Sequence, residues 1–138
     1  MIGRLRRIKP DGTVSAPLGG VPEVWAQGQG GLLDVALAPD FATSRRIYFS
    51  YSEPGDNGSA GTAAAMATLG DDAISDVRAI YRQQPKLVGP NHFGSRIAFD
   101  GHGHVFISQG ERFDRLRAQQ LDNLQGKLVR LNLDGTMP

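Results

Sequence analysis

The fold class of this chain follows from residues 91–111, which read NHFGSRIAFDGHGHVFISQGE. Ile97 and Phe99 alternate with Ala98 before a turn that is rich in glycine and aspartate. Val105 and Ile107 alternate with their neighbours in the same way after that turn. A period of two on both sides of a glycine-rich turn is typical of a β-hairpin. We therefore predict two antiparallel strands here, as part of an all-β fold.

The outer ends of this hairpin carry a histidine and a carboxylate. His92 precedes the first predicted strand, and Glu111 follows the second. Because antiparallel pairing brings the outer ends of a hairpin together, the two side chains should meet at one rim of the sheet. An imidazole on a rigid edge, oriented by a carboxylate, is suited to general-base catalysis. The simpler alternative is a rim histidine bonded to a loop beside an exposed turn carboxylate.

Composition limits the classes of protein to which the chain can belong. Of its 138 residues, 40% are hydrophobic and 21% are charged, which excludes a disordered chain and a membrane-embedded one. Fifteen basic and fourteen acidic residues leave a net charge of +1, so neither nucleic acid nor an anionic membrane is expected as a partner. There is no cysteine, which excludes disulfides and thiolate metal sites. The first residues lack the apolar segment of a signal peptide.

Short apolar segments separated by turn residues run along the whole chain. Eighteen glycines and eight prolines fall between these segments, as in an all-β protein with many turns. The segments predict strands over residues 4–9, 32–38, 46–52, 63–69, 77–82, 95–99, 104–109 and 127–133. Residues 112–124 are polar and fit either a loop or one short helix. The alternating Leu33, Val35 and Leu37 are expected to face the core.

An internal repeat indicates a β-propeller. Residues 4–13 (RLRRIKPDGT) resemble residues 127–136 (KLVRLNLDGT), and residues 33–40 resemble 96–100 at about half that spacing. About four short strands per period are typical of a propeller blade. We expect the end of one blade over residues 1–31, a complete blade over 32–90 and most of the next over 91–138. A propeller needs about four to eight blades, and two to two and a half blades do not close a ring, so we expect part of a longer protein.

Five segments together resemble the glucose/sorbosone dehydrogenase family, the soluble aldose sugar dehydrogenases that use pyrroloquinoline quinone, which implies that the chain is part of a six-bladed β-propeller. In chain order they are GQGGLLDV (28–35), APDF (38–41), NHFGSRI (91–97), QGE (109–111) and LQGKLVRL (124–131). The set covers most of the chain from Val21 onward and is specific only when taken together. The family often has a glycine where this chain has Ser95.

The resemblance implies a reaction and roles for four residues. In the family, the C1 hydroxyl of an aldose is oxidised to a lactone, a hydride passes to the quinone, calcium polarises the quinone, and an external acceptor takes the electrons. Carried over by position, His92 is the general base and Glu111 its carboxylate partner, while Gln29 and Asn91 line the pocket for sugar or quinone. The resemblance places the calcium ligands and most cofactor contacts in later blades, so no metal ligand is assigned within this chain. It also implies a periplasmic location.

Several simpler interpretations stay open beside this one. His102 and His104 flank a turn glycine with no third ligand nearby, so we expect solvated turn residues rather than a metal pair. Asp56-Asn57-Gly58 lacks the later acidic ligand of a calcium loop and fits a plain loop. Trp25 is expected to pack between blades. For the whole chain, a non-catalytic propeller scaffold and an inactive fragment are the alternative functions.

Overall fold

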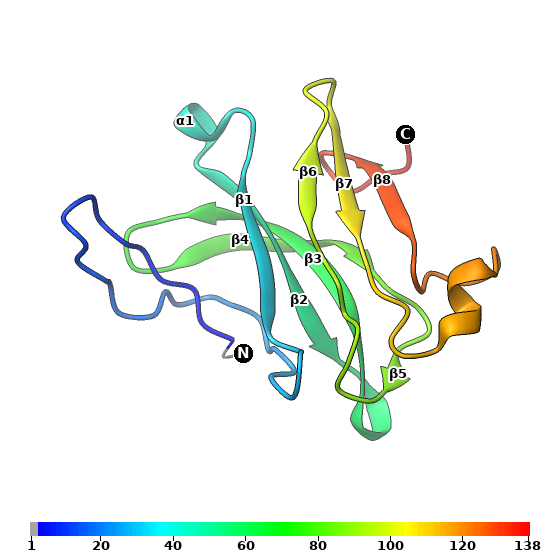
Figure 1. Ribbon diagram of the computed structural model, residues 1–138. Coiled ribbons are helices and arrows are strands. Elements are labelled where there is room, and N and C mark those ends of the chain that lie inside the picture. The colour runs from blue at the N-terminus through cyan, green and yellow to red at the C-terminus, as the bar shows by residue number, and fades with distance from the viewer. Residues whose placement is uncertain (1–2) are drawn as a thin grey trace.

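Two antiparallel sheets make up the computed structural model, which describes residues 3–138. The first sheet has the order β1-β2-β3-β4, with β5 pairing on β3, and the second has the order β6-β7-β8. The strands are β1 (Leu32–Leu37), β2 (Arg46–Pro54), β3 (Ser59–Leu69), β4 (Ile74–Arg82), β5 (Leu87–Val88), β6 (Ile97–Phe99), β7 (His104–Ser108) and β8 (Leu128–Asn132). Figure 1 shows the two sheets side by side, with the N-terminal segment on the far side of the first. The chain is therefore all-β and has the form of part of a propeller.

The predicted hairpin is confirmed as β6 and β7. Ile97 pairs with Ile107 and Phe99 pairs with Val105, so the alternating apolar residues share one face. Val105 and Ile107 are fully buried there. Strand β8 continues the sheet on the other side of β7, with Val105 opposite Leu131. The period of two therefore fixed the register of this sheet, because a slip by one residue would expose the buried set.

The two faces of the first sheet contact different partners. One face, which includes Ile47, Phe49 and Tyr51, packs against Leu18 and other residues of the N-terminal segment. The other face carries Tyr48 and packs against the second sheet. Strand β2 is buried from Ile47 to Ser52, as expected for a strand covered on both sides.

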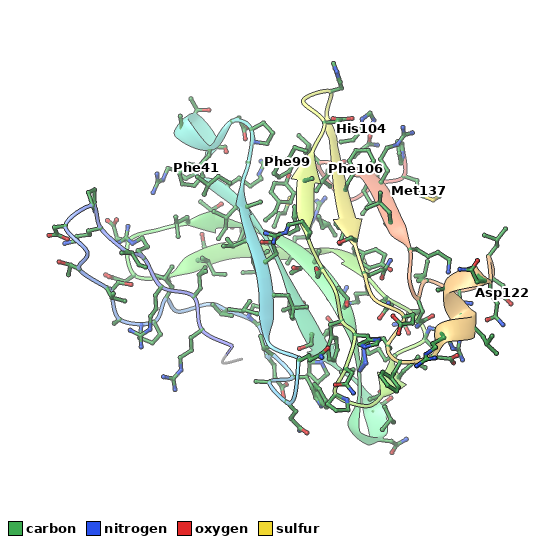
Figure 2. All side chains as sticks on the ribbon, in the orientation of Figure 1. Phe41, Phe99, His104, Phe106, Asp122 and Met137 are labelled. Atoms are coloured by element: carbon green, nitrogen blue, oxygen red, sulfur yellow. The ribbon has the colours of Figure 1, made fainter. Side chains whose placement is uncertain are left out.

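Tyr48 joins the two sheets. Its ring packs edge-on against Phe99 of β6 at a centroid distance of 5.1 Å, and its hydroxyl donates to the carbonyl of Leu133 at 2.8 Å. Phe99 is labelled on β6 in Figure 2. The side chain of Tyr48 is fully buried, and burial raises the pKa of its hydroxyl. These contacts hold the end of β6 and the residue after β8 at a fixed position relative to the first sheet.

Glu53 forms an ion-pair cluster near the end of β2. Arg82 Nε donates to Glu53 Oε1 at 2.8 Å, and Lys86 Nζ lies 2.8 Å from Glu53 Oε2. Burial alone would raise the pKa of this carboxyl, but the hydrogen bonds from Lys86 and Arg82 outweigh it and the pKa is lowered.

The strand predicted over residues 4–9 is not formed. Apart from one bridge between Ile8 and Val14, the backbone there makes only separate hydrogen bonds, such as Leu18 N–H to Leu5 O at 2.8 Å. Among residues 3–138, the backbone partner of this segment is the irregular stretch that follows its own turn. The similar sequence at residues 127–133 does form a strand, β8, because β7 provides a regular edge for it. Similar local sequences therefore take different structures where the pairing partner differs.

The expectation that Leu33, Val35 and Leu37 face the core is also wrong. A register shift between Leu32 and Asp34 interrupts the alternation, so Leu32 packs against the first core in place of Leu33. Val35 is 49% exposed and Leu37 is 57% exposed. They lie on β1, which is an edge strand, and the N-terminal segment covers the inner strands of that face instead.

The remaining helical elements are short. Residues 112–124, which fitted a loop or one helix, contain a single 3₁₀ helix at Arg115–Gln119. The α-helix α1 (Phe41–Ser44) and the 3₁₀ turn at Asp56–Gly58 were not predicted. Within the described part of the chain, no helix has the length and apolar character needed to cross a membrane.

Candidate functional site

Two loops at the outer end of the β6–β7 hairpin form the candidate site. Gly110 N–H donates to the carbonyl of Phe93 at 2.9 Å, and Arg112 N–H donates to the carbonyl of His92 at 3.2 Å. A side chain at Gly110 would place its Cβ 2.1 Å from the carbonyl oxygen of His92. Glycine at this position therefore allows the two loops to approach closely enough for their side chains to meet.

His92 and Glu111 are in direct contact, as the hairpin predicts. The ring nitrogen Nδ1 of His92 hydrogen-bonds Glu111 Oε1. The side chain of His92 remains 40% exposed, and that of Glu111 is 20% exposed. The hydrogen bond from His92 lowers the pKa of the Glu111 carboxyl, so this group is ionised at neutral pH.

This contact determines which nitrogen of His92 is available for chemistry. An ionised carboxylate only accepts hydrogen bonds, so the proton between the two groups belongs on Nδ1. The neutral imidazole then carries its lone pair on Nε2. The arrangement provides a base at Nε2, with a carboxylate on the far side of the ring to stabilise the imidazolium that forms when Nε2 accepts a proton.

Gln29 reaches the same loop from a distant part of the chain. Its Oε1 accepts a hydrogen bond from the backbone N–H of His92 at 2.8 Å, and its own N–H donates to the carbonyl of Pro90 at 2.9 Å. Gly28 permits this approach, because a Cβ there would lie 2.4 Å from Cβ of Pro90. The structure therefore brings Gln29 together with His92.

Asn91 lies immediately before His92 and is half-buried. Its carbonyl accepts a hydrogen bond from Arg112 Nη1 at 2.9 Å. Its side-chain amide forms no hydrogen bond among the residues that the structure describes. The backbone of Asn91 is thus fixed at the site, and its side-chain amide is available to bind a ligand.

Sequence reasoning missed Arg112 and Phe113, which directly follow Glu111. Arg112 is only 3% exposed, whereas Phe113 is 61% exposed and its ring centroid lies 4.8 Å from that of His92. Both residues have left-handed backbones, with φ values of 59° and 67°. No periodicity or spacing in the sequence indicates these contacts, because they depend on the fold of a loop.

Strained backbone is concentrated in these two loops. His92 has a φ of 56° and Ser95 has a φ of 89°, in addition to the two left-handed residues after Glu111. The hydroxyl of Ser95 is buried and has no hydrogen-bond partner. A side chain is thus unfavourable at Ser95, the position where the family resemblance implies glycine. Such clusters are found at functional sites, where the surrounding structure maintains the strain.

The His102–His104 turn, which the sequence raised as a metal pair, has a structural explanation. His104, at the tip of the hairpin (Figure 2), directs Nδ1 to Asp100 Oδ2 at 2.6 Å, and His102 is exposed in the same turn. Hydrogen bonds within this turn lower the pKa of Asp100 to about 2, although burial acts in the opposite direction. No group of three or more metal-binding side chains occurs within residues 3–138.

Trp25 lies against the candidate site without entering it. Its ring is half-buried and packs against Phe93 at a centroid distance of 5.7 Å. The predicted packing role is therefore supported by a contact with the residue that follows His92.

Several proteins similar to this chain are sugar dehydrogenases. The aldose sugar dehydrogenase YliI of Escherichia coli strain K12 is 58% identical over 138 residues, which cover 99% of this chain and 37% of that protein. The crystal structure of the soluble aldose sugar dehydrogenase of E. coli in its apo form matches with a TM-score of 0.94 and 57% identity, over 99% of this chain and 40% of that one. This chain therefore spans less than half the length of these relatives.

A more distant structure contains the quinone. The aldose sugar dehydrogenase of Streptomyces coelicolor in its PQQ-bound form matches with a TM-score of 0.83 and 27% identity, over 96% of this chain and 39% of that one. The family model for glucose/sorbosone dehydrogenases matches residues 2–138. Because this match covers nearly the whole sequence, the chain belongs to the glucose/sorbosone dehydrogenase family.

Proposed function

We propose that this chain supplies the proton-accepting part of the active site of a quinone-dependent aldose dehydrogenase. The observation that carries the proposal is the His92–Glu111 pair at a strained rim of the second sheet. Membership of a sugar dehydrogenase family supports it. The substrate is an aldose oxidised at C1, the product is the lactone, and an external acceptor then takes the electrons. A periplasmic location is part of the same proposal.

The proposed step separates a proton from a hydride. Nε2 of His92 accepts the proton of the C1 hydroxyl while the hydrogen on C1 leaves with its electron pair, and the C1–O bond becomes a carbonyl. Glu111 holds the ring through Nδ1 and stabilises the imidazolium. Pyrroloquinoline quinone, when bound, supplies the hydride acceptor. The role of this chain is to orient the hydroxyl and to take its proton.

The residues around His92 fit part of a quinone or sugar site. Gln29 and Asn91 offer amide groups that can donate to carbonyl or hydroxyl oxygens. Phe113 adds an exposed aromatic face beside the His92 ring. The nearest buried cation, Arg112, already donates to backbone carbonyls. The described residues thus suit contacts to neutral oxygens better than contacts to the carboxylates of the cofactor.

Calcium does not fit the described residues. Residues 3–138 contain no cluster of three or more acidic or histidine side chains that could hold a metal ion. Calcium prefers six to eight oxygen ligands. We therefore derive no step through calcium from this chain.

The test replaces the matching segment of the E. coli aldose sugar dehydrogenase by this chain and measures dye reduction with a panel of aldoses after addition of the quinone and calcium. His92→Gln should lower kcat by about 100-fold or more, because general-base catalysis contributes roughly 10²–10⁴. His102→Gln, an exposed histidine on the same hairpin, is the matched control. Near-normal oxidation by the His92 variant would exclude the proposed role, and a chimera that binds sugar without oxidising it would favour the scaffold alternative.

A further inference from the structure

Arg112 has contacts that the proposed reaction does not explain. Its guanidinium is buried, and it donates through Nη1 to the carbonyl of Asn91 at 2.9 Å. Through Nη2 it donates to the carbonyls of Gly89 at 2.6 Å and Leu87 at 3.3 Å. One side chain therefore holds three carbonyls of the segment that leads into His92. Such a pattern suits the planar, five-donor fork of arginine and does not suit the single ammonium of lysine.

A second contact fixes the guanidinium from the other side. The Cζ atom of Arg112 lies 3.6 Å from the centroid of the Phe93 ring, a cation–π geometry. Phe93 is 1% exposed, and its carbonyl accepts a hydrogen bond from Thr62 Oγ1 of β3 at 2.7 Å. The residue after His92 is therefore anchored to the first sheet, and Arg112 is anchored to that residue.

The charge of Arg112 strengthens these contacts. Burial lowers its pKa to about 10, while neighbouring Glu111 acts in the opposite direction, so the guanidinium is charged at neutral pH. Hydrogen bonds from a charged donor are stronger than those between neutral groups. A buried cation is retained only where such partners compensate for the lost hydration. The three carbonyls compensate Nη1 and Nη2 and the Phe93 ring covers one face of the guanidinium, whereas Nε is buried without a partner among the described residues.

The same residue is tied to both members of the catalytic pair. Arg112 follows Glu111 directly in the chain, and its backbone N–H donates to the carbonyl of His92 at 3.2 Å. His92 has a left-handed backbone, which is uncommon for a non-glycine residue and is maintained by the surrounding structure. The side chain of Arg112 holds the residues before His92, and its backbone holds His92 itself.

We infer that Arg112 is a positioning residue, which fixes the left-handed His92 loop so that Nδ1 of His92 meets the carboxylate of Glu111. The inference rests on the proposed function, because the geometry of the His92–Glu111 pair matters for catalysis only if His92 is the base. Arg112 itself need not contact the sugar or the quinone. Its effect passes through the loop carbonyls to the His92 ring.

The test compares Arg112→Lys and Arg112→Met with Arg115→Met in the full 138-residue chain. Arg115 is exposed on the same loop and serves as the matched control. Two signals are followed by NMR: the Nδ1–H proton of His92, and the pH titration of the Glu111 carboxyl carbon, whose titratable neighbour is His92 and whose charged neighbour is Arg112. Thermal unfolding is recorded for every variant, so that local and global effects are separated.

Arg112→Lys is the decisive variant because it keeps the positive charge and removes the planar guanidinium with its five N–H donors. We expect its Glu111 titration to move up toward that of an ordinary glutamate, and its His92 Nδ1–H signal to be lost through exchange. Arg115→Met should change neither signal. Unchanged signals in a folded Arg112→Lys chain would overturn the inference, and so would a lower unfolding temperature with both signals retained.

A measurement on the unsubstituted chain keeps the inference testable if both Arg112 variants unfold. The Nη–H groups of Arg112 should give separate, slowly exchanging signals, because they are bound to carbonyls in the interior. The Nη–H groups of Arg115 should exchange at the rate of a free guanidinium. Equal exchange for the two residues would refute the proposed contacts.

Kinetics separate this inference from the proposed function. In the E. coli chimera, Arg112→Lys should lower kcat by about 10- to 100-fold with little change in KM, since a small misplacement of a catalytic group costs about this much. The NMR readouts need neither sugar nor quinone. An active His92→Gln enzyme would therefore refute the proposed reaction without affecting the NMR result for Arg112. Unchanged NMR signals in Arg112→Lys would refute the positioning role of Arg112 without affecting the proposed reaction.

Discussion

Glu111→Gln is the substitution that most directly tests how the His92 base is tuned. The change keeps the shape of the side chain and removes its negative charge. Glutamine can still accept a hydrogen bond from Nδ1, but it no longer stabilises the imidazolium that forms when Nε2 takes the substrate proton. Glu111→Ala removes the acceptor altogether. The expected order of kcat is therefore the natural chain first, then Glu111→Gln, then Glu111→Ala.

The magnitude follows from the type and exposure of the contact. A hydrogen bond to a charged group contributes about 1.5–3 kcal/mol, and each 1.36 kcal/mol in the barrier corresponds to about tenfold in rate. The side chains of His92 and Glu111 are 40% and 20% exposed, so solvent screens the pair. For Glu111→Gln we therefore expect a loss at the lower end of this energy range, about tenfold in kcat. For Glu111→Ala we expect a loss of about 100-fold.

The assay is steady-state dye reduction by the E. coli chimera at saturating quinone, over a range of aldose concentrations. KM should change little, because the contact of Glu111 is with His92. Glu23→Gln, at an exposed position away from the site, is the control. A folded Glu111→Gln enzyme with kcat within twofold of the unsubstituted chimera would refute the claim that the charge of Glu111 stabilises the His92 imidazolium.

Three further predictions concern stability, each measured by urea unfolding of the full chain. Ser95→Gly should raise the unfolding free energy by about 1 kcal/mol, because it relieves a left-handed side chain and removes a buried hydroxyl without a partner, and a loss of stability would contradict this. Gly110→Ala should destabilise by about 2 kcal/mol or more and displace His92, whereas Gly19→Ala, with its nearest side-chain contact at 3.5 Å, should be tolerated. The Glu53 carboxyl has a folded-state pKa below the ordinary 4.5. Its contribution to the free energy of unfolding is therefore complete above pH 4.5 and is lost as the pH falls through the folded-state pKa. Glu53→Gln should flatten this acid-side decline, and an unchanged pH profile would count against the ion-pair cluster.

Alternation and turn chemistry were sufficient to predict most of the strands. Residues 97–107 form the expected hairpin because their apolar residues can be buried only in one register. The meeting of His92 and Glu111 follows from the same register, since it is a consequence of antiparallel pairing. The family could likewise be identified from short motifs in order. These features are local, or depend on a single pairing, so the sequence by itself determines them.

Tertiary structure decided the features that depend on which partner is present. Val35 and Leu37 have the pattern of core residues, but they lie on an edge strand after a register shift and remain exposed. Residues 4–9 resemble residues 127–132 and yet form no strand, because no regular edge lies beside them within residues 3–138. Arg112 carries no sequence signal at all. Its role arises because the fold places three carbonyls and an aromatic ring around one guanidinium, and burial makes each of those contacts necessary.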